Sequence, residues 1–172
     1  MGRRIAVVGV SGNGKTTLAR AAAAKLGVPY VELDALNHKP GWIEASDEEL
    51  RAAADEATRG DAWVADGSYY AKLGMLVHDR ADEVVWLDQA LALVLYRLVK
   101  RAVIDIVTKR DMFNGNRQTW RFAFWGRDSL VGYAIRMYFG RRRAWPQQFA
   151  AVDTPVTRLR RPREVERWLA QL

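Results

Sequence analysis

The feature that most constrains this chain is a glycine-rich loop near its N-terminus, Gly9-Val-Ser-Gly-Asn-Gly-Lys15-Thr16. The four residues before it, Ile5-Ala-Val-Val8, are apolar and mostly β-branched, which predicts a short buried strand. The segment after it, residues 16–26, is rich in alanine and predicts a helix that Gly27 ends. A strand, a tight loop and a helix in this order indicate a parallel α/β arrangement.

The loop matches G-x-x-x-x-G-K-[ST] at every fixed position, which is the pattern of a phosphate-binding P-loop. Glycines let backbone N–H groups approach phosphate oxygens, and the following helix directs its positive N-terminus at the same anion. Lys15 is expected to reach the β- and γ-phosphates, and the Thr16 hydroxyl to join a magnesium shell. The alternative is a chance glycine-rich turn, which the flanking strand and helix argue against. We therefore expect ATP and Mg²⁺ as cofactors, and the predicted nucleotide-binding residues are Gly9, Ser11, Gly12, Asn13, Gly14, Lys15, Thr16 and Thr17.

Strand and helix patterns alternate along most of the remaining chain. Further strands are predicted at residues 30–34, 63–66, 83–87 and 156–159. Helices are predicted at residues 47–59, from Asp88 to about residue 109, and at 163–170. Ser46-Asp-Glu-Glu49 is a capping box for the first of these helices, and Asp88 is the expected N-cap of the second. This alternation predicts a parallel sheet covered by helices on both faces.

The composition excludes several classes of protein. There is no cysteine, which rules out disulfides and thiolate metal sites and is compatible with a reducing cytoplasm. The two histidines, His38 and His78, are too few and too far apart for a histidine-rich metal site. No apolar run approaches the roughly 20 residues that span a bilayer, and residues 5–8 are too short for a signal-peptide core. The expectation is a cytoplasmic protein with no membrane partner.

The positive charge is concentrated in one segment of the chain. Residues 97–143 hold twelve Lys or Arg against three Asp, a local net of +9, whereas the remainder has 15 against 17 Asp or Glu, a net of −2. Such a segment attracts phosphates on a nucleotide, a nucleic acid or a membrane surface, and charge alone does not choose among them. Residues 106–143 are also aromatic, with an Asn114-Gly115 turn signal and no clear strand pattern. We read them as an inserted, mostly helical lid.

Several short motifs follow the loop in order. They are Leu33-Asp-Ala-Leu36, Pro40-Gly-Trp42, Trp63-Val-Ala-Asp-Gly-Ser-Tyr69, Val84-Val-Trp-Leu-Asp88, Asn114-Gly-Asn-Arg117 and Arg161-Pro-Arg-Glu-Val165. Together they resemble the bacterial adenylate-kinase-like P-loop ATPases labelled DNA topology modulation or FlaR-like proteins, grouped with AAA-family ATPases. The resemblance covers nearly the whole chain. It implies a single nucleoside-monophosphate-kinase-like domain over residues 1–172, with a five-stranded parallel sheet in the order 2-3-1-4-5, helices on both faces, and a helical lid at about 106–143.

Three aspartates lie near the predicted carboxyl ends of strands. In the implied strand order Asp66 ends beside the P-loop, where related kinases place the acid that holds magnesium; the alternative is a turn aspartate before Gly67. Asp34 is predicted to end the second strand, where related small-molecule kinases place an acid that contacts the acceptor hydroxyl, or else to serve as a cap. Asp88 follows a strand resembling Walker B, but its place before a helix favours capping.

Arginines supply the remaining predicted catalytic charge. Arg97 and Arg101 are four apart and share a helix face, and their spacing resembles the arginines of nucleotide kinases that neutralise the transferring phosphoryl group. The alternative is a solvated face with Arg101 paired to Asp105. Further lid candidates are Arg117, Arg121 and Arg127, whereas 141–143 are expected to be solvated.

Aromatic residues suggest both core and site positions. Trp63, Trp86 and Trp168 are predicted core residues, and His38 a surface loop residue. Trp42 is either an acceptor-pocket wall or a loop anchor. The aromatic residues that interleave with the lid arginines could stack on a base or form a small lid core; they are Trp120, Phe122, Phe124 and Trp125.

Three functions compete at this point. The first is a kinase-like phosphotransferase that moves the γ-phosphate of ATP to a small acceptor, either a nucleotide or a hydroxyl metabolite. The second is an ATP-dependent, nucleic-acid-binding regulator, and the third a slow ATPase with no acceptor. The loop, the carboxylates and the basic lid favour the first.

Overall fold

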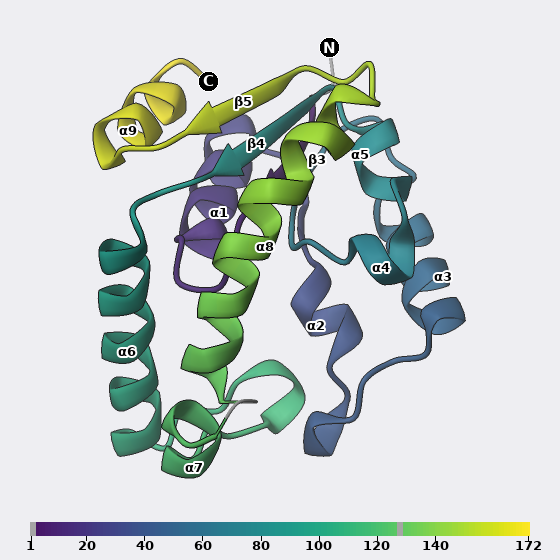
Figure 1. Ribbon diagram of the computed structural model, residues 1–172. Helices are drawn as coiled ribbons and strands as arrows, with labels where there is room; N and C mark the ends of the chain where they lie inside the picture. Colours follow the sequence, from purple (N-terminus) through teal and green to yellow (C-terminus); the bar gives the residue numbers. More distant parts are fainter. Residues whose placement is uncertain (1–2, 127–128) are drawn as a thin grey trace.

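The protein is built around a five-stranded, all-parallel sheet in a computed structural model that describes residues 3–126 and 129–172. The strand order is β2-β3-β1-β4-β5, which confirms the predicted topology (Figure 1). The strands are β1 (Arg4–Val8), β2 (Tyr30–Glu32), β3 (Trp63–Asp66), β4 (Glu83–Leu87) and β5 (Val156–Leu159). Because β3 lies between β2 and β1, Asp66 is the register partner of Val7 and lies next to the P-loop, as the implied strand order predicted.

Helices cover both faces of the sheet. One face packs against α1 (Lys15–Leu26) and α9 (Pro162–Ala170). The other face packs against α3 (Asp47–Ala57), α4 (Tyr70–Leu73), α5 (Leu76–Arg80) and the second half of α8 (Leu130–Ala150). Trp63, Trp86 and Trp168 are buried in these two layers, as predicted. Among the described residues, no helix is long and apolar enough to cross a membrane.

The remaining elements lie beyond the carboxyl ends of the strands. They are α2 (Leu33–Asn37), η1 (Pro40–Trp42), α6 (Leu91–Val107), η2 (Phe113–Gly115) and α7 (Trp120–Phe124). Figure 1 shows α6 and α8 standing at this end of the molecule, with α7 between their far ends. The described part of residues 106–143 is thus mainly helical, and α8 returns the chain from this end to β5.

Local signals set several helix ends. The predicted capping box opens α3, because Ser46 Oγ accepts from the Glu49 N–H while the Glu49 carboxylate accepts from the Ser46 N–H. Gly27 ends α1 in the left-handed conformation. Two helices end earlier than predicted: α3 stops at Ala57 rather than at residue 59, and α6 stops at Val107 rather than at about residue 109.

One predicted strand end and one predicted helix cap are wrong. The second strand stops at Glu32, and Asp34 lies in the first turn of α2 rather than at a strand end. The N-cap of α6 is Ala90, so Asp88 does not cap that helix. In both places a tertiary contact replaces the local pattern: Leu33 packs against Gly67, and Asp88 is drawn into ion pairs.

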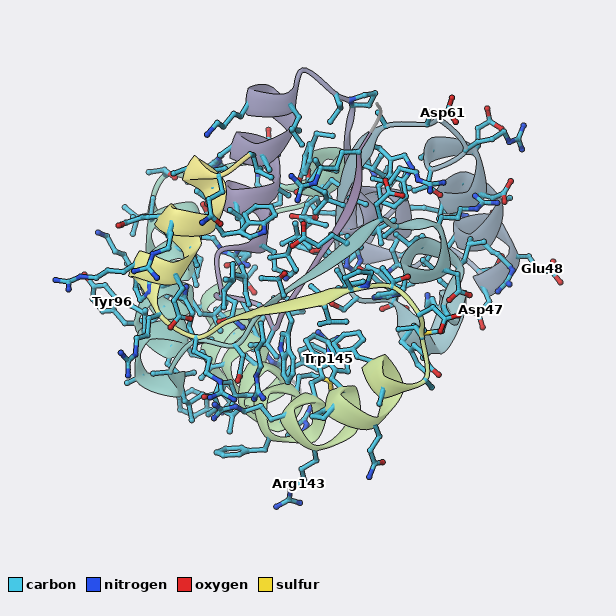
Figure 2. The ribbon with its side chains drawn as sticks, turned by 90° about the horizontal axis from the view of Figure 1, so that it is seen from above. Asp47, Glu48, Asp61, Tyr96, Arg143 and Trp145 are labelled. Carbon is cyan, nitrogen blue, oxygen red and sulfur yellow. The ribbon has the colours of Figure 1, made fainter. Side chains whose placement is uncertain are left out.

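Helix α8 carries large side chains from the basic segment back to the sheet. Figure 2 shows Trp145 pointing toward the strands and Arg143 pointing away from the protein. The Trp145 ring contacts Trp86 edge-on at 5.5 Å and Phe149 at 5.6 Å. Pro146 lies inside this helix, where it is exposed. The C-terminal half of the helix is therefore anchored by the aromatic core, while its N-terminal half packs against α6 and α7 and carries residues of the site.

Candidate active site

The P-loop leaves backbone donors available at the start of α1. Gly12 and Gly14 have φ values of 88° and 87°, in the left-handed region that favours glycine. Helix α1 begins at Lys15, and no side chain caps its first turn. The N–H groups at this helix start are therefore free of a capping side chain and can bind an anion, with the helix dipole assisting.

Close packing holds the P-loop against β4 and α6. A Cβ atom on Gly12 would lie 2.6 Å from the Val94 carbonyl oxygen, so only glycine fits there. Asn13 is buried, and its Nδ2 donates to the Leu87 carbonyl oxygen at 2.9 Å. Arg97 Nη1 donates to Gln89 Oε1 at 2.7 Å and to the Asn13 carbonyl at 3.5 Å. The predicted residue Arg97 thus lies at the loop itself.

Lys15 is near two carboxylates, those of Asp34 and Asp66. Burial lowers its pKa, whereas Asp34 and Asp66 act in the opposite direction. Asp66 is 1% exposed, and neither of its carboxylate oxygens has a hydrogen-bond partner among the described residues. Burial raises the pKa of Asp66, while the nearby Thr16 hydroxyl and Lys15 ammonium act to lower it. The structure therefore brings together three predicted residues, Lys15, Thr16 and Asp66.

The unpartnered carboxylate of Asp66 fits a bound cation. A buried charge without a partner is costly, and a cation beside it removes that cost. Magnesium prefers oxygen ligands and is held in nucleotide sites by a few protein oxygens together with phosphates. The Thr16 hydroxyl and the Asp66 carboxylate supply oxygens of this kind at the start of the phosphate cradle.

Asp34 is oriented by a partner that sequence reasoning did not name. The Tyr69 hydroxyl donates to Asp34 Oδ1 at 2.7 Å. Burial raises the pKa of Tyr69, and the Asp34 carboxylate raises it further, so the phenol stays a donor across the working pH range. Asp34 Oδ2 makes no hydrogen bond with the residues that the structure describes. One oxygen is thus fixed and the other is available.

Arg141 was expected to be solvated, and the structure shows otherwise. Its guanidinium donates to the carbonyl oxygens of Gly9 and Ser68, each at 3.3 Å, and lies over the Trp145 ring. Burial lowers its pKa, with Tyr133 and Asp34 acting in the opposite direction. It has no ion-pair partner within residues 3–126 and 129–172.

A sequence signal for Arg141 does exist. It lies on the inward stripe of α8, three residues after Tyr138 and four before Trp145; the buried members of the stripe are Ala134, Tyr138, Trp145 and Phe149. An arginine on such a stripe is enclosed with its apolar neighbours.

Asp88 forms the ion-pair cluster that displaces the predicted cap. Its carboxylate accepts from Arg142 Nε at 2.7 Å and from Arg158 Nη2 at 2.6 Å. The Arg158 guanidinium lies 4.0 Å from the centre of the Trp86 ring. Arg142 is therefore also not simply solvated, because it ties α8 to the carboxyl end of β4. Of residues 141–143, only Arg143 is exposed and forms no hydrogen bond or ion pair within the described part of the chain.

The other predicted arginines are exposed. Arg101 lies near enough to Lys15 to lower its pKa. The alternative, an Arg101–Asp105 pair, is not formed among the described residues, and Asp105 instead faces Arg110 at 4.0 Å. Arg117 pairs with Asp111 at 2.7 Å, and Arg121 is exposed on α7. Arg127 lies outside the described residues.

The aromatic residues of α7 do not form a lid core. Trp120, Phe122 and Trp125 are 54%, 43% and 82% exposed. Trp42 is a loop anchor, because its Nε1 donates to the Arg117 carbonyl and its ring stacks on Phe122 at 5.4 Å.

The sheet order and the glycine cradle at the start of α1 define the chain as a P-loop NTPase domain. Residues 5–108 match the family described as "ATPase family associated with various cellular activities (AAA)". The chain belongs to this family. No curated protein matches it.

Solved structures of small kinases share the fold. A shikimate kinase from Acinetobacter baumannii in complex with shikimate has a TM-score of 0.61 and 19% identity, over 99% of this chain and 90% of that one. A shikimate kinase from Bacteroides thetaiotaomicron has a TM-score of 0.55 and 19% identity, over 98% and 95%. A gluconokinase from Sinorhizobium meliloti 1021 has a TM-score of 0.53 and 21% identity, over 98% and 92%.

Proposed function

We propose that this protein is a phosphotransferase that moves the γ-phosphate of ATP to a hydroxyl or phosphate oxygen of a small acceptor. The observation that carries this proposal is the second carboxylate at the P-loop. Phosphate binding and magnesium need Lys15, Thr16 and Asp66. Asp34 is additional: it is close enough to affect the pKa of Lys15, and one of its oxygens is held by Tyr69. A nucleotide-binding switch has no need of this group.

Separate residues would bind the phosphates, hold the metal ion and accept the proton. The backbone amides at the start of α1 and the Lys15 ammonium hold the phosphates, and Thr16 with Asp66 would hold Mg²⁺, which supplies charge neutralisation when bound. The acceptor oxygen forms a bond to the γ-phosphorus as the bond to the bridging oxygen of ADP breaks. The proton of a hydroxyl acceptor passes to Asp34 Oδ2, which Tyr69 leaves open.

Positive charge around the cradle would stabilise the transferring phosphoryl group. Arg97 is held at the loop by Gln89, and the half-buried Arg141 donates to the carbonyl oxygens of Gly9 and Ser68. Phosphoryl transfer depends on positioned cations more than on covalent chemistry. We assign Arg97, Arg101 and Arg141 to this role. Arg117 and Arg121 would join it only if residues 106–143 close over the site as a lid.

The acceptor remains a class rather than a compound. The structural neighbours include kinases named for shikimate and gluconate, which supports a small hydroxyl-bearing acceptor. The resemblance to nucleoside-monophosphate kinases supports a nucleotide instead. A coupled ADP-release assay across sugar acids, polyols and nucleoside monophosphates tests both. If no acceptor raises turnover above the rate with water, the phosphotransferase proposal fails.

A second function is favoured by one surface. Trp120, Phe122 and Trp125 are exposed on and beside α7, next to Arg121. Exposed rings interleaved with arginine can stack on single-stranded bases, which is compatible with the DNA topology modulation resemblance. Titration of a labelled single strand at two salt concentrations tests this, since phosphate-driven binding weakens steeply with salt. Salt-independent binding, or none, excludes it.

A further inference from the structure

The Asn114-Gly-Asn-Arg117 motif has no part in the phosphate site, yet it makes a dense set of contacts across the molecule. Asn114 Nδ2 donates to the carbonyl oxygens of Ala35 at 3.2 Å and His38 at 2.5 Å. These carbonyls belong to α2 and its C-terminal end, one turn from Asp34. The motif therefore contacts the element that carries the proposed proton acceptor.

Asn116 makes the complementary contacts. It is 4% exposed; its Nδ2 donates to the Lys39 carbonyl at 2.9 Å and to the Phe113 carbonyl at 2.8 Å. Its Oδ1 accepts from the Trp42 N–H at 2.8 Å. Both ends of this side-chain amide are thus used, and its orientation is fixed by donors and acceptors on two sides.

A column of rings joins the same two segments independently of the asparagines. His38 stacks on Phe113 at 5.9 Å and meets Trp42 edge-on at 5.5 Å. Trp42 in turn stacks on Phe122 of α7 at 5.4 Å. The rings therefore come from residues 35–42, which we call the acceptor-side segment, and from residues 112–122, which we call the lid base.

The lid base is also connected to the P-loop through α6. Gly12 packs against the Val94 carbonyl, and Arg97 donates to the Asn13 carbonyl. Helix α6 then runs from these contacts to Val107, five residues before the lid base begins. Helix α6 and the four residues after it thus connect the P-loop to the lid base, and the asparagines connect the lid base to the acceptor-side segment, which gives a change at the P-loop a route to that segment.

We propose that Asn114 and Asn116 are positioning residues that make the lid base and the acceptor-side segment one rigid unit, so that nucleotide at the P-loop orders both together. The consequence for the proposed function, on which this inference rests, is that Asp34 reaches its working position only when the lid base does. The asparagines act through α2 and touch no reacting atom.

Hydrogen exchange with and without Mg²⁺ and a non-hydrolysable ATP analogue tests the proposal. In the wild-type protein, the analogue should slow exchange in both segments by a similar factor, on the order of tenfold at saturation. In Asn114→Gly, the analogue should still slow exchange in the lid base. The slowing of exchange in the acceptor-side segment should fall at least severalfold. Glycine suits this variant because Asn114 has a φ of 53°, so the side-chain amide is removed without strain in the backbone.

Two further variants make the result decisive. Asn116→Ala should uncouple the segments more completely, and its thermal unfolding curve shows whether it folds. Asp111→Asn is the matched control, since it breaks the exposed Asp111–Arg117 pair in the same loop without touching the acceptor-side segment. It should respond as the wild type does.

Each contrary result overturns the proposal. Equal responses in wild type and Asn114→Gly would show that the asparagines do not couple the segments. The proposal also fails if, in the wild type, the analogue slows exchange in the lid base alone or in neither segment. Calorimetry on the same samples reports nucleotide binding separately, and the exchange experiment needs no acceptor. Failure of the phosphotransferase assay is therefore distinguishable from failure of this inference.

Discussion

The Tyr69 hydroxyl donates to Asp34 Oδ1 across 2.7 Å, joining the loop after β3 to the first turn of α2. This bond fixes the carboxylate beside Lys15, whose pKa it affects. Because burial and Asp34 both raise the pKa of Tyr69, the phenol stays protonated and remains a hydrogen-bond donor.

Tyr69→Phe should therefore slow transfer without weakening nucleotide binding. Loss of one orienting hydrogen bond at a reacting group is expected to lower kcat by roughly 10- to 100-fold. The Kd for ATP should stay within about twofold, because the Tyr69 hydroxyl bonds Asp34 and not a P-loop group. Steady-state kinetics and calorimetry measure the two. A weakened Kd with an unchanged kcat would show that Tyr69 supports the loop instead.

Lys15→Ala should abolish phosphate-dependent turnover and leave the fold intact. A single positioned group that stabilises transferring charge is worth about 100-fold or more in kcat, while the partly enclosed lysine adds little to the core. ADP release and the thermal midpoint measure the two effects. Arg163→Ala, an exposed change on α9, is the control and should alter neither. Undiminished turnover in Lys15→Ala would contradict the proposed site.

Gly12→Ala should damage both stability and nucleotide binding. The new Cβ would meet the Val94 carbonyl at 2.6 Å in a left-handed conformation, so the loop or α6 must shift. We expect a loss of about 1–3 kcal/mol in the free energy of unfolding. Gly60→Ala is the matched control, since a Cβ atom at Gly60 would meet no atom within 4 Å. Chemical denaturation of both variants makes the comparison, and equal stabilities would refute the packing argument.

Asp88→Asn should destabilise the protein, because it leaves two arginines without their shared counter-ion. The loss should be roughly 1–3 kcal/mol, less than for a fully buried pair, since the arginine side chains are 41% and 31% exposed. The exposed Asp111→Asn change should cost far less. If urea denaturation shows the two variants to be alike, the Asp88 cluster contributes nothing to anchoring α8.

His78 should make stability depend on pH in the mildly acidic range. Burial lowers its pKa below the ordinary value of 6.5, so the unfolded chain binds more protons between the two values. The stability contribution is therefore complete above about pH 6.5 and is lost as the pH falls toward the folded-state pKa. His78→Phe should flatten the slope of unfolding free energy against pH over this window. A slope equal to that of the wild type would exclude His78 as its source.

The structure confirms much of what the sequence predicts at the level of elements. Three of the five strands, β3, β4 and β5, have exactly the predicted bounds, and the capping box of α3 is present. The P-loop pattern placed Lys15 and Thr16 at a helix start, where the structure has them. These features rest on residues within a few positions of one another, because strand periodicity, caps and glycine turns are local chemistry.

The pairing of distant charges was decided only by the tertiary structure. Asp88 looks like a helix cap from its neighbours, but its partners Arg142 and Arg158 are 54 and 70 positions away. Asp34 meets Tyr69 over 35 positions, and Arg141 meets Gly9 over 132. A charged side chain takes whichever partner the packing of helices against the sheet brings within reach, and local sequence does not specify that packing. The sequence alone thus determined the phosphate cradle and the layered α/β fold, while the three-dimensional packing decided which carboxylates and arginines face it.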